Sequence, residues 1–406
     1  MERRFCRITV DPKAEKRIRS GHPWVYGEDT AAACGSYENG DLVDVVTGKG
    51  SWLGTGFVND RSKIRVRLIC RDPNQTFDEA FWERRIRYAL DYRKTVCGGL
   101  SCCRLIFGEA DQFPGWTLDK FGDVLVSETL SLGIERRKDL LFPILIRLLK
   151  EEGETVSVLY ERNDAPVRAL EGMEPFCGFY AFDGLRTDTD GTVLIEENGV
   201  RYLVDYVRGQ KTGYFLDQKW NRQAVCSLSK GKRVLDCFTH TGSFALNAAF
   251  GGASSVTAVD VSEEALKTAG TNAELNGFSD RIAFVCADAF DYLQDLLDRK
   301  QKPFDLIVLD PPAFTKSGDT VKNAYLGYRR INYAAMKILP RGGYLATCSC
   351  SHFMTDGLFR SMLSDAAAAA SVQLKQIEAR QQGRDHPVLW SVPETAYLKF
   401  YIFQIL

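Results

Sequence analysis

Several predicted strands in the second half of the chain end on an acidic side chain. The segments Arg233–Asp236, Ser255–Asp260 and Leu306–Asp310 are largely apolar, have the length of a strand, and close on an aspartate. In an open parallel sheet ligands bind beyond the carboxyl ends of the strands, so these carboxylates are expected to meet at one site. A single aspartate in such a place would most simply cap the next helix. Three of them favour a binding site.

The loop after the first of these strands indicates what the site binds. Asp236 is followed by Cys-Phe-Thr-His-Thr-Gly, which lacks the G-x-G-x-x-G pattern of a dinucleotide site, so we expect a cofactor without a pyrophosphate. Asp260 suits the two hydroxyls of a ribose, and Asp288 after the next strand suits the edge of an adenine. S-adenosylmethionine, a positively charged adenosine cofactor, fits this set. The residues predicted to contact it are Asp236, Phe238, Thr239, Thr241, Gly242, Asp260, Val261, Asp288, Ala289 and Asp310.

A second motif predicts how a flat base would be held. In Asp310–Phe314 two prolines fix an extended turn and leave backbone carbonyls without competing donors. Such a turn can hold the polar edge of a base, with Phe314 or a neighbouring aromatic ring as a stacking surface. The predicted substrate contacts are therefore Pro311, Pro312 and Phe314. A plain turn is the alternative.

Two of the 12 cysteines, Cys348 and Cys350, fall at the end of the fifth predicted strand. A thiolate there can add to carbon 6 of a cytosine and make carbon 5 nucleophilic enough to accept a methyl group. This chemistry needs a thiol that loses its proton readily and a hydrogen bond at the ring nitrogen beside carbon 2, which suits Asp310. An enzyme that methylates an amine needs no cysteine. No second cysteine or histidine pair stands at metal-ligand spacing, so no metal is expected.

Strand and helix patterns alternate around these motifs. From about Lys232 to Thr347 five short apolar strands alternate with helical segments, which predicts a parallel, doubly wound sheet. A long apolar run, Tyr397–Leu406, predicts a final strand. Ahead of this region, Asn198-Gly199 separates Thr192–Glu197 from Val200–Asp205, the strongest short signal for a β-hairpin.

The first half of the chain divides into two further parts. Alternating segments such as Leu42–Val46 and Lys63–Ile69, separated by glycine-rich turns, predict a small β-barrel over residues 1–75 with a mildly basic face. Helices near 77–95 and 136–152 with a strand at 156–160 predict a separate α+β domain over residues 76–190. The hairpin and the doubly wound sheet then form a third domain, residues 191–406.

Composition limits the classes of protein to consider. Lys and Arg total 52 and Asp and Glu 53, a net charge of -1, which excludes a generally polycationic coat protein but allows a local basic surface. There is no apolar run of about 18 residues that could span a membrane. The segment Met1–Cys6 lacks the apolar core of a signal peptide. We therefore expect a cytoplasmic protein with reduced cysteines.

The motifs together resemble one known family along the whole chain. The matching segments are Gly21–Tyr26, Phe107–Asp111, Phe113–Trp116, Asp119, Tyr160–Asp164, Arg168, Glu171-Gly172, Thr212–Gln218, Asn221-Arg222, Asp310–Pro312 and Asp385–Pro387. This set is similar to the PUA-domain class I methyltransferases, a family that includes the bacterial 23S rRNA cytosine-carbon 5 methyltransferase. The resemblance implies a PUA β-barrel, a central α+β domain and a Rossmann-like α/β methyltransferase domain, with S-adenosylmethionine as cofactor.

The resemblance also implies roles for particular residues. Family members that form 5-methylcytosine carry a Ser-Cys-Ser element like Ser349–Ser351, so we assign the nucleophile to Cys350. Cys348 follows a threonine, as the catalytic cysteine does in another RNA cytosine methyltransferase family, and is the alternative. The run before the methyltransferase core implies that Gln218 contacts cofactor and that Tyr214 and Arg222 contact substrate.

The implied substrate is large-subunit (23S) rRNA, free or in an assembly intermediate. Two other functions stay open: an RNA methyltransferase that modifies an exocyclic amine or ring nitrogen, and a noncatalytic RNA-binding assembly factor. The target nucleotide is not predicted, and the oligomeric state, a homodimer included, is left open.

Overall fold

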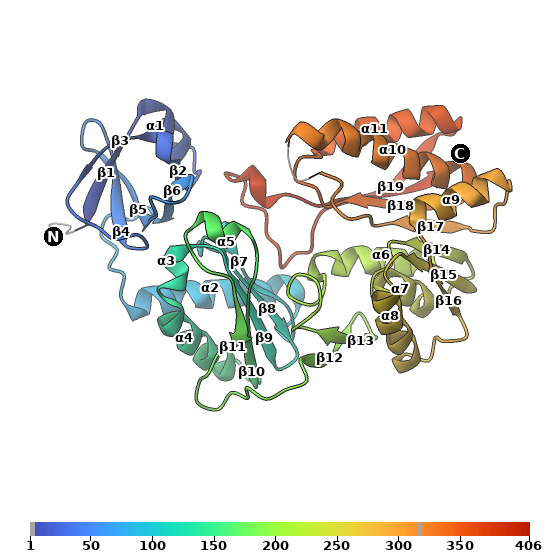
Figure 1. Ribbon diagram of the computed structural model, residues 1–406, viewed down its shortest axis with the longest axis horizontal. Helices are drawn as coiled ribbons and strands as arrows, with labels where there is room; N and C mark the ends of the chain where they lie inside the picture. Colours follow the sequence, from blue (N-terminus) through green and yellow to red (C-terminus); the bar gives the residue numbers. More distant parts are fainter. Residues whose placement is uncertain (1–4, 316–317) are drawn as a thin grey trace. The chain divides into compact units, whose positions relative to one another are not determined.

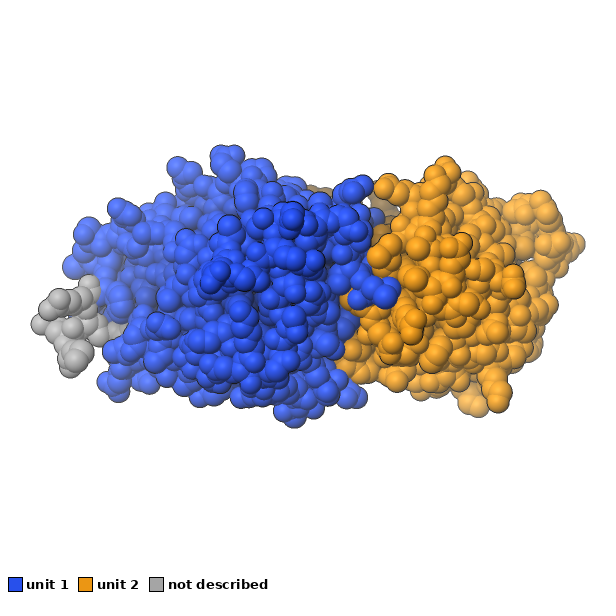
Figure 2. All heavy atoms as spheres, turned by 90° about the horizontal axis from the view of Figure 1, so that it is seen from below, with its two compact units in different colours: residues 1–194, 204–216, 384–395 blue, residues 195–203, 217–383, 396–406 orange. Residues whose placement is uncertain are grey.

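The computed structural model describes residues 5–315 and 318–406 (Figure 1). Residues 1–4, which belong to the Met1–Cys6 segment assessed for a signal peptide, lie outside the described residues. The chain forms two compact units, coloured separately in Figure 2. The first unit contains residues 1–194, 204–216 and 384–395, and the second contains 195–203, 217–383 and 396–406. No helix of the described chain is long and apolar enough to cross a membrane.

The N-terminal part of the first unit is a β domain with one helix. Its sheet has the order β2-β6-β5-β4-β1-β3, in which β1 pairs with β4 in parallel and the other neighbours are antiparallel. Alternate strand residues such as Ile8, Val43 and Val66 are fully buried and form one core. The elements are β1 (Cys6–Val10), α1 (Pro12–Arg19), β2 (Trp24–Tyr26), β3 (Thr30–Cys34), β4 (Leu42–Thr47), β5 (Trp52–Val58) and β6 (Ile64–Cys70).

The rest of the first unit is an α+β domain. Its five-stranded sheet has the order β11-β10-β9-β8-β7. β9 and β10 pair in parallel, as a crossover through α4 requires, while the other neighbours are antiparallel. The elements are α2 (Glu79–Cys97), β7 (Cys102–Phe107), β8 (Trp116–Phe121), β9 (Val124–Thr129), α3 (Leu132–Glu135), α4 (Lys138–Glu151), β10 (Val158–Asn163), α5 (Val167–Leu170) and β11 (Phe176–Phe179).

Local signals account for the limits of α2. Asp78 caps its start, because the carboxylate accepts the Phe81 N–H at 3.0 Å. Gly98 ends it in the left-handed conformation at φ 78°. The predicted helices at 77–95 and 136–152 correspond to α2 and α4, and the predicted strand at 156–160 corresponds to β10.

The predicted hairpin is confirmed. β12 (Thr192–Glu197) and β13 (Val200–Asp205) form a two-stranded sheet. Asn198 and Gly199 both have positive φ, 55° and 79°, as the two-residue turn requires.

The core of the second unit is a seven-stranded sheet in the order β16-β15-β14-β17-β18-β20-β19. The strands from β16 to β18 are parallel, and β20 is antiparallel to both of its neighbours. The strands are β14 (Arg233–Cys237), β15 (Ser255–Asp260), β16 (Ile282–Cys286), β17 (Leu306–Leu309), β18 (Tyr344–Ser349), β19 (Leu374–Arg380) and β20 (Lys399–Ile405). The predicted doubly wound α/β sheet is therefore confirmed.

Helices cover both faces of this sheet. Figure 1 shows α9, α10 and α11 on one side and α6, α7 and α8 on the other. Apolar residues of α9, α10 and α11 join those of the central strands in one buried cluster. The helices are α6 (Lys219–Leu228), α7 (Ser243–Phe250), α8 (Glu263–Leu275), α9 (Ala289–Asp298), α10 (Val321–Ile338) and α11 (Asp356–Ala370).

Candidate active site

The strand order changes direction at β14, because β15 and β16 lie on one side of it and β17 and β18 on the other. Ligands of open α/β sheets bind at the carboxyl end of such a switch point. Asp236 lies near the end of β14, Asp260 ends β15, and Asp310 directly follows β17. The predicted carboxylates thus come from three neighbouring strands at this end of the sheet.

Asp236 is fully buried, and the protein uses only one of its carboxylate oxygens. Oδ2 accepts hydrogen bonds from the Thr239 hydroxyl at 2.5 Å and the Ala245 N–H at 2.9 Å. Oδ1 has no hydrogen-bond partner among the described residues. Burial, together with the carboxylates of Asp310 and Asp260, raises the pKa of Asp236 to about 7. A positively charged donor next to Oδ1 would satisfy both the oxygen and the charge.

The loop after β14 is held in an uncommon backbone conformation. Phe238 and His240 have φ of 64° and 51°, in the left-handed region that residues other than glycine seldom adopt. The His240 N–H donates to Asp260 Oδ2 at 2.8 Å, which fastens the loop to the end of β15. Gly242 also has positive φ, 85°, and a Cβ there would lie 3.0 Å from Ala269 Cβ. Such conformations are typical of ligand-binding loops that their surroundings hold in place.

Asp260 and Asp288 differ in the hydrogen bonds that their carboxylates already accept from the protein. Asp260 accepts one N–H at each oxygen, from His240 and from Ser262, and a second lone pair remains at each. Its neighbour Val261 is 73% exposed, an apolar surface beside a carboxylate. Asp288 is exposed and caps α9, accepting the Phe290 N–H at 2.7 Å. The helix-cap interpretation therefore holds for Asp288, and its contact with adenine stays a prediction.

Asp310 forms a small polar cluster with Gln218 and Cys348. Its Oδ1 accepts from Gln218 Nε2 at 3.1 Å and from the Cys348 thiol at 2.9 Å. Gln218 is buried, and its Oε1 accepts from Asn221 Nδ2 at 2.6 Å. Asn221 in turn accepts from Arg380 Nε at 3.2 Å. The structure thus brings three of the predicted site residues together and orients the Gln218 amide toward Asp310.

The two candidate nucleophiles lie in different environments. Cys348 is fully buried within β18, and its thiol also contacts the Leu309 carbonyl at 3.3 Å. Burial, together with the nearby Asp310 carboxylate, raises the pKa of the Cys348 thiol well above its usual value. Cys350 follows the end of β18 and is partly exposed. An added base can therefore reach Cys350 more readily than Cys348.

The residues of the turn after β17 differ from one another in exposure and packing. Pro311 is buried and Pro312 is exposed. The ring of Phe314 packs against Tyr328, with centroids 4.5 Å apart, and against Phe290 at 5.7 Å. Phe314 thus belongs partly to the apolar cluster under α10, and its role as a stacking surface stays a prediction.

Two further residues that are expected to contact substrate, Arg222 and Tyr214, are both buried. Arg222 is fully buried and forms a two-pronged ion pair with Glu197 of the hairpin, with distances of 2.8 and 2.9 Å. This ion pair joins α6 to β12. Tyr214, in the first unit, is 4% exposed. The substrate contacts of Arg222 and Tyr214 stay predictions.

Sequence reasoning did not single out Lys399 or Tyr328. The hydroxyl of Tyr328 accepts from Ser349 Oγ at 2.9 Å. Lys399 is buried and donates to the carbonyl of Ser351. A single cation inside the apolar run Leu398–Ile402 was the available signal for Lys399.

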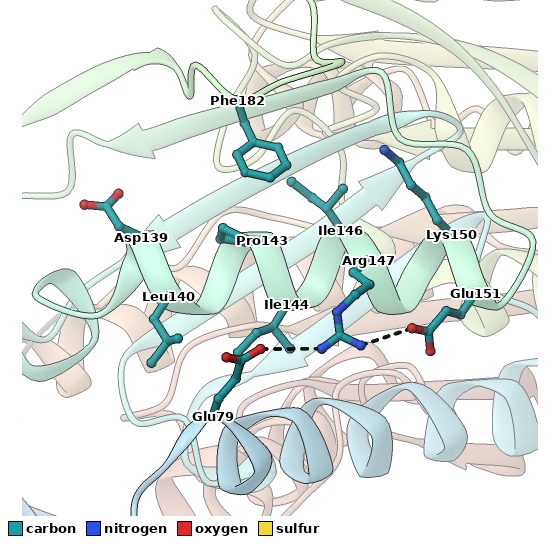
Figure 3. Close-up of a pocket in the computed structure, with 10 residues that line it drawn as sticks. All are labelled: Glu79, Asp139, Leu140, Pro143, Ile144, Ile146, Arg147, Lys150, Glu151 and Phe182. Atoms are coloured by element: carbon teal, nitrogen blue, oxygen red, sulfur yellow. Dashed lines mark hydrogen bonds and ion pairs between the residues drawn. The ribbon is translucent and has the colours of Figure 1, made fainter.

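A pocket of about 720 Å³ lies apart from these residues, in the first unit. Figure 3 shows it between α4, the start of α2 and Phe182, with Arg147 ion-paired to Glu79 and Glu151. None of the predicted site residues lines it. Within residues 5–315 and 318–406, no group of three or more His, Cys, Asp or Glu side chains could hold a metal ion.

The switch-point site and its carboxylates define a Rossmann-like enzyme that binds a nucleoside cofactor. Residues 177–403 match the family model for S-adenosylmethionine-dependent methyltransferases, and residues 8–71 match a PUA-like domain. The chain therefore belongs to the S-adenosylmethionine-dependent methyltransferases that carry a PUA-like domain, and S-adenosylmethionine is its cofactor. The resemblance drawn from the sequence motifs is confirmed.

Relatives match over nearly the whole chain. Ribosomal RNA large subunit methyltransferase I of Escherichia coli O139:H28 is 39% identical over 405 residues, which cover 98% of this chain and 99% of the relative. The protein of the same name from Shigella boydii serotype 18 is 39% identical over 403 residues, with the same coverage.

Solved structures show the same fold. A proposed SAM-dependent methyltransferase from Streptococcus mutans has a TM-score of 0.81 at 21% identity, covering 98% of this chain and 99% of that one. A proposed methyltransferase solved in complex with SAH has a TM-score of 0.82, with the same identity and coverage.

Proposed function

We propose that this methyltransferase modifies carbon 5 of a cytosine in large-subunit (23S) rRNA through a covalent adduct with Cys350. The relatives named ribosomal RNA large subunit methyltransferase I, at 39% identity and full coverage, support the substrate class. The observation that carries the choice of carbon 5 is a partly exposed cysteine directly after β18, beside the strand end where Asp310 contacts Cys348. Methylation of an amine would need no thiol there. A cytoplasmic location follows from this substrate class.

The cofactor would be held by the residues around the switch point. When bound, S-adenosylmethionine supplies a methyl group activated by a positively charged sulfur. Asp236 Oδ1 is a buried acceptor without a partner among the described residues, and it suits the ammonium group of the cofactor. The free lone pairs of Asp260 suit the ribose hydroxyls, and exposed Val261 suits a face of the adenine. Gln218 orients Asp310 at the same end of the sheet.

The chemistry on the base would be carried out by Cys350 and Asp310. The thiolate of Cys350 adds to carbon 6, and the electron pair of the 5,6 double bond makes carbon 5 nucleophilic. Asp310 in its protonated form donates a hydrogen bond to the ring nitrogen beside carbon 2, which stabilises the charge that this addition creates. After carbon 5 is methylated, a base removes its proton. The electron pair then reforms the double bond, and the thiolate of Cys350 leaves.

Single substitutions of the two cysteines test this proposal. Cys350→Ala should abolish methylation of rRNA and the covalent adduct with RNA that contains 5-fluorocytosine, while affinity for S-adenosylmethionine is kept. Cys348→Ala should retain substantial turnover, because the Cys348 thiol is buried and its pKa is raised well above the usual value. Adducts are scored on denaturing gels and cofactor affinity by calorimetry.

The other possible results of these substitutions lead to different conclusions. If Cys348→Ala is inactive and Cys350→Ala is active, the covalent route stands with the other nucleophile. If both single variants and the double variant methylate RNA, the carbon 5 proposal fails and methylation of an amine or ring nitrogen replaces it. A wild-type protein that binds cofactor and rRNA but does not methylate the RNA would be an assembly factor.

A further inference from the structure

A buried lysine lies opposite the end of the strand that carries the two cysteines. Lys399 begins β20 and pairs with Ser349, the last residue of β18. Its side chain is 8% exposed and stands in the otherwise apolar run Leu398–Ile402. A buried ammonium group is costly unless nearby groups compensate its charge. The burial of the Lys399 ammonium group therefore requires a physical reason.

The partners of the ammonium group are two neutral carbonyls. Nζ donates to the carbonyl of Ser351 at 2.5 Å and to that of Tyr397 at 2.8 Å. Lys399 forms no ion pair with any carboxylate of the described chain. Two of its three donors are thus used on uncharged acceptors. The positive charge is left without a dedicated counter-ion.

The bond to Ser351 fixes the residue that follows Cys350. Ser351 is buried, and its hydroxyl donates to the Thr315 carbonyl at 2.9 Å, which ties it to the segment after the double proline. On the other side of Cys350, the hydroxyl of Ser349 donates to Tyr328 at 2.9 Å. Cys350 is therefore held between two anchored serines, and Lys399 contacts one of them and faces the other across the sheet.

The groups that act on Lys399 include both cysteines. Burial lowers the pKa of Lys399 to about 8, while Cys350, Asp356 at the start of α11 and Cys348 act in the opposite direction, with Cys350 the strongest of the three. Tyr328 of α10 is a further titratable neighbour of both thiols. Among these, Cys350 is the partly exposed thiol. A cation next to a thiol favours the thiolate, which is the reactive form.

We propose that Lys399 is the positioning residue of the nucleophile: it holds the Ser349–Ser351 segment in place, and its positive charge keeps Cys350 as a thiolate. This assignment rests on the proposed function, which makes Cys350 the nucleophile. In this assignment the counter-ion of the buried Lys399 ammonium group is the thiolate of Cys350. The pair would be neutral overall when Cys350 is ionised and Lys399 is protonated.

The test is the rate at which iodoacetamide alkylates Cys350 in the full-length protein, followed by mass spectrometry of its peptide from pH 6 to 10. The wild-type midpoint should lie below the ordinary value for cysteine of about 8.5. Lys399→Met should raise the midpoint by about one pH unit and slow alkylation near pH 7 about tenfold. Lys399→Arg keeps the charge and should stay close to wild type.

A matched control is available in another buried lysine. Lys120 is 1% exposed, and its Nζ contacts the Gly122 carbonyl and Glu154, all in the first unit. Lys120→Met should leave the alkylation profile of Cys350 unchanged. In the methylation assay, Lys399→Met should lower kcat, while the KM for S-adenosylmethionine stays near wild type. A merely structural lysine would shift neither the pH midpoint nor this ratio.

Two results would overturn the proposal. One is a wild-type Cys350 that alkylates with a midpoint at or above about 8.5, which needs no variant and so does not depend on whether Lys399→Met folds. The other is an unchanged midpoint in folded Lys399→Met. Failure of the proposed function would look different, because Cys350→Ala would then still methylate RNA while the alkylation profile still reported on Lys399.

Discussion

At the scale of single residues, the acidic side chains of the site differ in how much of their hydrogen-bonding capacity the protein itself uses. The Asp288 carboxylate accepts hydrogen bonds from backbone N–H groups in the first turn of α9. Asp260 uses one lone pair of each oxygen on backbone N–H groups. Asp236 leaves Oδ1 without a partner in the described part of the chain, although it is fully buried. The spare acceptors therefore lie at Asp236 and Asp260.

Replacing Asp260 tests its proposed contact with the ribose. A charge-assisted pair of hydrogen bonds is worth about 1.5–3 kcal/mol, so Asp260→Ala should weaken cofactor binding about ten- to hundredfold. Affinity for rRNA should stay near wild type, and calorimetry measures both. Asp78→Ala is the control: it removes the helix cap of α2 in the first unit and should cost about 1 kcal/mol of stability without changing cofactor affinity. Unchanged cofactor affinity in Asp260→Ala would remove this residue from the site.

The raised pKa of Asp236 predicts a pH dependence of stability. With its folded pKa at about 7 and an unfolded value near 3.9, the folded chain holds a proton that the unfolded chain has lost between these values. The free energy of unfolding, measured without cofactor, should therefore fall as the pH rises from about 5 to about 7.5. Asp236→Asn removes this contribution, so its urea midpoint should fall less over that range. An identical fall in both proteins would contradict the assignment.

At the scale of elements, local signals could be predicted and long-range pairings could not. The turn at Asn198-Gly199 was predictable because both residues must adopt positive φ, a property of the two residues themselves. The strand β19 was missed because it is a sheet-edge strand whose side chains are mostly exposed, so it has no apolar alternation. The ion pair of Arg222 with Glu197 joins residues 25 positions apart and leaves no local pattern.

The ion pair between Arg222 and Glu197 leads to a prediction at the scale of elements. Both side chains are fully buried, so Arg222→Met deprives a buried carboxylate of its two-pronged partner and should cost about 3–5 kcal/mol of stability. Adding Glu197→Leu should recover most of this loss, because two packed apolar side chains can replace a buried pair. Urea unfolding measures the stabilities. If the stable double variant binds rRNA more weakly than wild type, Arg222 contacts substrate after all.

At the scale of the whole molecule, the two units are built from interleaved stretches of chain. Residues 384–395 come late in the sequence but belong to the first unit. There the Asp385 carboxylate accepts the Arg104 N–H at 2.9 Å, and its carbonyl accepts from Arg93 at 2.9 Å. The Asp385–Pro387 motif was noticed in the sequence, but its partners are almost 300 positions away. The predicted boundaries at residues 75 and 190 stay predictions.

The net charge of -1 makes a prediction about how the whole protein binds RNA. Attraction to phosphates must come from a local surface. Helix α1 buries Ala14 and Ile18 in the core of the PUA-like domain and leaves Lys13, Lys16 and Arg19 exposed. Changing these three to Gln should weaken rRNA binding and reduce the slope of log K against log salt by about 0.7–0.9 for each phosphate that the variant no longer neutralises. Cofactor affinity should not change.

A control with the same change in charge separates a local effect from a general one. Lys230, Arg299 and Lys375 are exposed in the second unit, at the ends of elements opposite the carboxyl edge of the sheet. Arg299 pairs with Asp295 one helical turn earlier, as Arg19 pairs with Glu15, so each triple change to Gln removes one exposed ion pair. Such pairs contribute about 0–1 kcal/mol, so neither variant should unfold. The control should keep the wild-type salt slope. If the α1 variant also keeps it, helix α1 contacts no phosphate, and the basic surface that binds rRNA lies elsewhere on the chain.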